Sequence, residues 1–124
     1  MPVTLWVRTG DAECGEAQRF MRANKYGADQ VRDVMASPPK GTEWDAIRKG
    51  LGGAIWPAVD ARHVRYGELL PRGAEDMGES ELEAILTHNA DMIRVPLLLT
   101  PKGALAGFRE RKWRDFLDIG KGRA

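Results

Sequence analysis

Hydrophobic residues recur along the chain in short runs and in helical stripes that predict alternating strands and helices. The run at 3–7 combines β-branched and aromatic residues and is followed by Thr9-Gly10, so we expect a buried strand there. Apolar positions three and four residues apart then predict a helix that ends near 25–27, and 28–34 is expected to form a second strand. A strand, a helix and a strand in this order predict a parallel, right-handed βαβ unit.

The middle of the chain, about 37–92, is expected to be a helical insert. A helix is predicted to start near Thr42, because apolar residues follow it at helical spacing. Ser80–Glu83 matches a capping box, in which a serine and a glutamate three residues later satisfy the first N–H groups of a helix. Residues 54–78 have no clear periodicity beyond a short helix expected near Tyr66.

The last third of the chain predicts a strand over 94–100, a turn, a hairpin partner over 104–108 and a helix over 109–117. The complete order is therefore β-α-β, a helical insert, and β-β-α. This order is the thioredoxin-like fold of the α/β class, with a four-stranded mixed sheet. We expect residues 1–124 to form a single domain of this kind.

Composition and charge limit the classes of function. The chain has 19 basic and 18 acidic side chains, a net charge of +1, so we expect neither direct nucleic-acid binding nor a membrane. The single cysteine cannot form an internal disulfide and no leader is apparent, which predicts a cytoplasmic protein. His63 and His88 lack ligands at metal-binding spacing, so we expect no metal. The four tryptophans are predicted to pack in the core: Trp6, Trp44, Trp56 and Trp113.

Cys14 is the first candidate for chemistry, because it lies in the first turn of the helix that follows the first strand. A helix N-terminus favours the thiolate and lowers a cysteine pKa, whereas the neighbouring Glu13 and Glu16 oppose that effect. Two interpretations stay open: a reactive thiolate, or a small half-buried apolar residue. Asp11 is either a helix N-cap, or a group that holds the Cys14 proton or acts as a general base at the rim of a pocket.

Two segments carry a resemblance to a known family. Residues 86–96, Leu-Thr-His-Asn-Ala-Asp-Met-Ile-Arg-Val-Pro, are similar to the family's helix, turn and third strand, and residues 107–117 are similar to its closing Gly-Phe step and last helix. The sequence resembles the ArsC/Spx family, the thioredoxin-fold group that contains glutaredoxin-coupled arsenate reductases and Spx-type regulators of RNA polymerase. Counted from the aromatic residue of the first strand, Asp11 lies where the attacking cysteine is expected and Cys14 lies at the second cysteine position.

The resemblance implies two functions. In the first, a thiol oxidoreductase acts through Cys14, with no bound cofactor and with glutathione as co-substrate or glutaredoxin or another protein thiol as partner. In the second, a catalytically degenerate module binds a protein such as RNA polymerase, as Spx-type proteins do. True arsenate reduction is not expected, because Ala17 and Gln18 replace the Ser and Arg of the arsenate reductase motif in the register that aligns Cys14 with its cysteine.

Further site residues follow from the same resemblance. Arg94 resembles the family arginine that holds an anion, although Val95 separates it from Pro96. Pro96 resembles the cis-proline that faces the active cysteine. Arg109 is a supporting candidate, and two more arginines near family positions are Arg62 and Arg65. An arginine at the surface with no ligand is the alternative for each of them.

Overall fold

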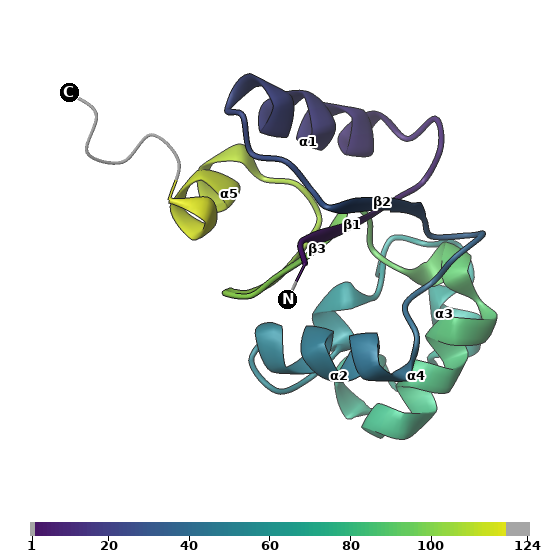
Figure 1. Cartoon of the computed structure of the whole chain (residues 1–124). Coiled ribbons are helices and arrows are strands. Elements are labelled where there is room, and N and C mark those ends of the chain that lie inside the picture. The colour runs from purple at the N-terminus through teal and green to yellow at the C-terminus, as the bar shows by residue number, and fades with distance from the viewer. Residues whose placement is uncertain (1, 119–124) are drawn as a thin grey trace.

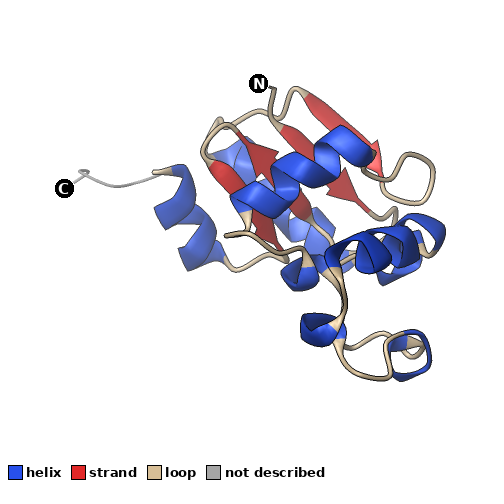
Figure 2. Ribbon diagram, turned by 90° about the horizontal axis from the view of Figure 1, so that it is seen from below, coloured by secondary structure: helices blue, strands red, loops and turns tan. Residues whose placement is uncertain are grey.

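The computed structural model describes residues 2–118, and it places four strands in one mixed sheet. The order of the strands is β2-β1-β3-β4; β1 pairs with β2 in parallel, whereas β3 pairs with both β1 and β4 in antiparallel fashion. Figure 2 shows the strands side by side with a helix crossing them. The predicted thioredoxin-like fold with a four-stranded mixed sheet is thus confirmed. The strands are β1 (Thr4–Val7), β2 (Gln30–Asp33), β3 (Leu97–Thr100) and β4 (Gly103–Ala106).

Helices cover both faces of the sheet (Figure 1). α1 and α5 lie on one face, and the helices of the insert lie on the other. The helices are α1 (Ala12–Ala23), α2 (Gly41–Gly50), α3 (Tyr66–Leu69), α4 (Glu79–His88) and α5 (Glu110–Leu117), with 3₁₀ turns η1 (Trp56–Ala58), η2 (Ala74–Asp76) and η3 (Ala90–Met92). No helix within residues 2–118 is long and apolar enough to cross a membrane.

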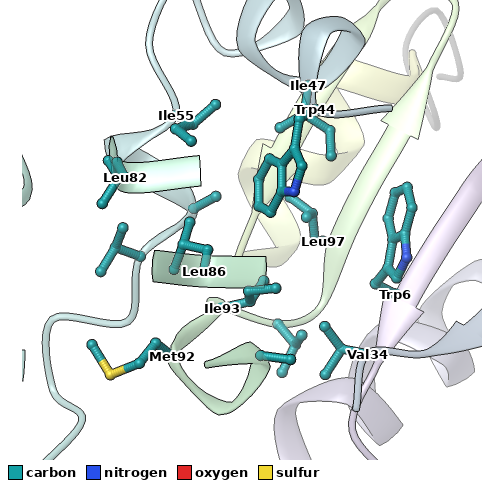
Figure 3. Packing of buried hydrophobic residues seen from close by; sticks show 14 of the residues in the cluster. Trp6, Val34, Trp44, Ile47, Ile55, Leu82, Leu86, Met92, Ile93 and Leu97 are labelled. Atoms are coloured by element: carbon teal, nitrogen blue, oxygen red, sulfur yellow. The ribbon is translucent and has the colours of Figure 1, made fainter. Parts of the chain in front are cut away.

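Alternation along the strands divides the core into two parts. Leu5 of β1 and Leu98 of β3 face α1 and α5, whereas Trp6 and Leu97 face the insert, as the period of two in a strand requires. Figure 3 shows the larger part, in which Trp44 of α2 packs near the sheet together with residues of the insert. The two helical layers therefore pack on opposite faces of one sheet.

Two local expectations are wrong. α4 begins at Glu79 after Gly78, with no side-chain cap, so Ser80 is inside the helix and the predicted capping box does not form. Glu79 instead accepts hydrogen bonds from the Ile55 N–H, at 3.1 Å, and from Arg48. Trp56, predicted to be in the core, is 45% exposed. In both cases contacts between segments of the insert, which local spacing does not encode, decide the outcome.

Candidate functional site

Cys14 lies in the first turn of α1 with its side chain directed into the core. Asp11 is the N-cap of this helix: its carboxylate accepts a hydrogen bond from the Cys14 N–H at 2.9 Å. The Cys14 residue is only 2% exposed and belongs to the core cluster that includes Trp6. Its Sγ accepts a long hydrogen bond from the Arg8 N–H at 3.4 Å. The N-cap interpretation of Asp11 is therefore confirmed.

The environment of the thiol opposes its ionisation. Burial raises the pKa of the Cys14 thiol to about 12, the Arg8 N–H hydrogen bond acts in the opposite direction, and the Asp11 carboxylate adds to the rise. The position at a helix N-terminus predicts a lowered pKa, but desolvation outweighs that effect here. At neutral pH this side chain is a protonated thiol, which is the poorer nucleophile.

The cis-proline loop lies next to this turn. The Val95–Pro96 peptide is cis, as the resemblance implies for Pro96, and Val95 is part of the same core cluster as Cys14. The guanidinium group of Arg8 donates to the carbonyl oxygens of Asp91 and Ile93 at 3.0 and 3.4 Å. Arg8 therefore connects the thiol to the loop that precedes the cis-proline.

Arg94 is occupied by a carboxylate of the chain itself. Its Nη1 and Nη2 donate to the Oε1 and Oε2 of Glu13 at 3.2 and 3.1 Å, in a bidentate pair. Glu13 Oε2 also accepts the Phe108 N–H at 2.6 Å, and Arg62 Nη2 lies 3.7 Å from Oε1. Gly107 makes room for the pair, because a Cβ at this position would lie 2.7–2.9 Å from the guanidinium group. The Arg94 guanidinium and the Phe108 N–H thus bind a carboxylate that belongs to the chain itself, that of Glu13.

Two adjoining clefts open beside this ion pair. The first has a volume of about 450 Å³ and includes Arg62 in its lining. The second, about 620 Å³, extends along β4 to α5. Trp56, Pro57, Arg94 and Arg109 line both clefts, and Arg109 is exposed. The structure therefore brings the predicted residues Arg94 and Arg109 together at one surface, whereas Cys14 does not line either cleft.

The remaining candidates have structural partners. Arg65 donates to Asn89 Oδ1 at 2.9 Å and to Asp91 at 3.4 Å, and His63 Nε2 lies 2.9 Å from the same Asp91 carboxylate. These contacts fasten the segment before α3 to the segment after α4. Within residues 2–118, no group of three or more His, Cys, Asp or Glu side chains could hold a metal ion.

The contact between Glu13 and Arg94 cannot be predicted from local sequence. The sequence indicates Glu13 only as a charge next to Cys14, whereas in the structure it binds Arg94 and the Phe108 N–H, which are 81 and 95 residues away along the chain. The inserted Val95 was a signal that Arg94 departs from the family pattern, but it did not name the new partner. Trp56 lies at the surface although its apolar neighbours in the sequence predict burial.

Solved structures of ArsC-like proteins have the same fold as this chain. The chain matches an ArsC family related protein from Bacteroides fragilis with a TM-score of 0.80 and 23% identity, over 94% of this chain and 99% of the other. It matches the arsenate reductase from Vibrio cholerae with a TM-score of 0.75 and 18% identity, over 96% and 98%. The chain has an ArsC-type fold. An ArsC-related protein from Brucella melitensis matches more loosely, with a TM-score of 0.63 and 13% identity over 96% and 97%.

These matches confirm the resemblance to ArsC-like proteins at the level of the fold. They extend over nearly the full length of both chains in each pair, so the ArsC-type fold includes the helical insert as well as the sheet. No protein-family model and no curated protein matches the sequence. Because one fold can carry unrelated activities, the function has to be argued from the residues of this chain.

Proposed function

We propose that this protein is a binding or regulatory module on an ArsC-type scaffold that has lost thiol catalysis. The observation that carries the proposal is the state of the only cysteine: Cys14 is 2% exposed, and burial raises the pKa of its thiol to about 12. A thiol oxidoreductase needs an accessible sulfur with substantial thiolate character at neutral pH. The position expected for the attacking cysteine holds Asp11, whose carboxylate is used to cap α1.

The anion site gives independent support. Arg94, the arginine that would hold an oxyanion, already holds the Glu13 carboxylate together with the Phe108 N–H. An incoming arsenate would have to displace this carboxylate and lie beside its negative charge, which costs electrostatic energy. We therefore do not expect arsenate reduction, in agreement with the departures from the arsenate reductase motif.

Thiol accessibility tests this proposal directly. The native protein should react with a disulfide reagent such as dithiobis(nitrobenzoate) far more slowly than the same protein in denaturant, at pH 7 to 8.

The protein should not turn over arsenate or a model disulfide with glutathione and glutaredoxin supplied. Cys14→Ser should retain any partner captured by the wild type, with purified RNA polymerase as the first bait because Spx-type proteins act on it. Rapid native reaction combined with Cys14-dependent turnover would refute the proposal.

A Cys14-dependent reductase is the second candidate. One observation favours it: Cys14 also borders a surface groove formed by the β1–α1 loop and the start of α1, with a volume of about 710 Å³. Opening of the first turn of α1 could expose the sulfur there to glutathione disulfide or to a protein disulfide. In that case the native thiol should become labelled with glutathione at neutral pH, and Cys14→Ser should abolish both the label and the turnover.

A further inference from the structure

A groove follows the outer edge of the sheet, and we call it the β4 groove. Its floor is the end of β4, and α2 and η1 form one wall while the start of α5 forms the other. Figure 1 shows α5 above and α2 below the hairpin that contains β4. The groove has a volume of about 620 Å³ and is lined by Gly50, Leu51, Trp56, Pro57, Arg94, Ala104, Leu105, Ala106, Gly107, Arg109, Lys112 and Trp113.

The lining carries charge of one sign. It includes three cationic side chains and no carboxylate, in a chain whose net charge is only +1. Arg94 is compensated by Glu13 from outside the groove. Arg109 and Lys112 are exposed, and neither forms an ion pair within residues 2–118. The uncompensated positive charge is therefore concentrated at the α5 wall, where a negatively charged ligand would be attracted.

The floor of the groove is the free edge of an edge strand. Pro96 accepts the Gly107 N–H at 2.8 Å, so that pair is hydrogen-bonded, and in an antiparallel ladder hydrogen-bonded pairs alternate with pairs that are not. Ala106, which is opposite Leu97, therefore directs its N–H and C=O away from β3. We find no other hydrogen-bond partner for these two groups among residues 2–118. Such groups can accept an added extended chain.

The opposite wall offers an apolar contact. Trp56 is 45% exposed although the other three tryptophans are fully buried or nearly so, and Pro57 stands next to it. Tryptophan and arginine, here Trp56 and Arg109, are side chains that the centres of protein interfaces favour. The small side chain of Ala106, which is partly exposed, leaves room for a ligand backbone to approach the floor.

We propose that the β4 groove docks an extended acidic segment of a partner protein. The segment lies along the edge of β4, exchanges backbone hydrogen bonds with Ala106, packs an apolar side chain on Trp56 and places carboxylates against Arg109 and Lys112. This inference rests on the proposed binding function and identifies the chemistry of the partner. Single-stranded nucleic acid is less well suited, because the floor is a peptide edge and the basic residues form no extended track.

A peptide titration tests the proposal on the full chain. The probe is a fluorescein-labelled peptide of alternating glutamate and valine, and binding is followed by fluorescence anisotropy at low salt. Arg109→Glu combined with Lys112→Glu should weaken binding at least tenfold. The matched control is Arg111→Glu combined with Lys25→Glu, which reverses the same number of charges at exposed positions outside the groove and should change binding less than twofold. Trp56→Ala should also weaken binding at least fivefold.

Each outcome decides for or against the groove. Equal loss with the Arg111 and Lys25 control would mean that net charge alone attracts the peptide, and this would overturn the proposal. Equal or tighter binding of a lysine-valine peptide or of oligothymidine would overturn it as well. If the peptide does not bind while native Cys14 remains unreactive, the docking site fails but the proposed function stands. If Cys14 reacts rapidly and supports turnover, the proposed function fails regardless of the peptide.

Discussion

Replacing Glu13 by alanine removes the carboxylate that joins α1 to the loops around β3 and β4. In the native protein this carboxylate accepts two N–H groups of Arg94 and the Phe108 N–H. A hydrogen bond to a charged group contributes roughly 1.5–3 kcal/mol to stability, and its loss leaves the partners to be rehydrated. The change therefore tests whether the contact between Glu13 and Arg94 stabilises the fold.

The expected magnitude follows from exposure. The Glu13 and Arg94 side chains are 25% and 23% exposed, so solvent screens the pair in part and the freed groups regain some water. We expect Glu13→Ala to lower the free energy of unfolding by about 2–3 kcal/mol, less than three full charged hydrogen bonds would contribute. At roughly 4 °C per kcal/mol for a domain of this size, Tm should fall by about 10 °C.

Urea titration and thermal unfolding followed by circular dichroism measure the effect. Glu16→Ala is the matched control, because Glu16 lies one turn further along α1 and is exposed, so its removal should cost less than about 0.5 kcal/mol. A double-mutant cycle with Arg94→Ala should give a coupling energy of at least about 1 kcal/mol. Equal losses of stability in Glu13→Ala and Glu16→Ala, or strictly additive effects of Glu13→Ala and Arg94→Ala in the double-mutant cycle, would refute the reasoning.

Three further predictions concern burial and packing. The Cys14 thiol has a pKa of about 12 in the folded protein and about 8.5 when unfolded, so above pH 8.5 the unfolded state loses its proton first and is favoured. The free energy of unfolding of the wild type should therefore match that of Cys14→Ala in its pH dependence below pH 8.5 and fall by about 1.4 kcal/mol per pH unit relative to it above that pH. Parallel pH profiles would contradict this prediction. Trp6→Phe should destabilise the protein by about 1 kcal/mol more than Trp44→Phe in urea titrations. The buried Trp6 indole N–H donates to the Ser37 carbonyl oxygen at 3.0 Å, whereas the Trp44 indole N–H has no partner among residues 2–118. Equal losses of stability in the two variants would disprove this prediction. Gly50→Ala should lower the free energy of unfolding by about 1–3 kcal/mol, because the added Cβ would lie 2.6 Å from the backbone of the β3–β4 hairpin. Gly41→Ala in the same helix meets no atom within 4 Å and should be neutral or slightly stabilising. Similar unfolding midpoints of the two variants would rule out this packing.

The order of elements was largely predictable because it depends on local periodicity. The apolar stripe of α1 was correctly placed, and its members Ala17, Phe20 and Met21 are buried. Boundaries were less precise: the strand predicted over 94–100 begins at Leu97, because residues before it form a bridge from Ile93 to Val59 and then the cis-proline turn. Propensity and alternation determine whether a strand exists, whereas neighbouring segments determine where it starts.

The candidate site was predictable only in part. The sequence placed Asp11 at the N-cap and Cys14 in the first helical turn, since both depend on a few adjacent residues. It could not decide whether the thiol was reactive, because helix position and desolvation act in opposite directions and burial is produced by distant segments of the core.

By itself, the sequence determined the mixed sheet, the helical layers and the presence of one thiol near a helix N-terminus, because hydrophobic spacing, turn residues and residue identity are local properties. Only the tertiary structure decided that Cys14 is enclosed and that Glu13 neutralises Arg94 across 81 residues of chain. Burial and charge pairing depend on which atoms meet in space, and that is fixed when the sheet brings α1 against the loops beside β3 and β4.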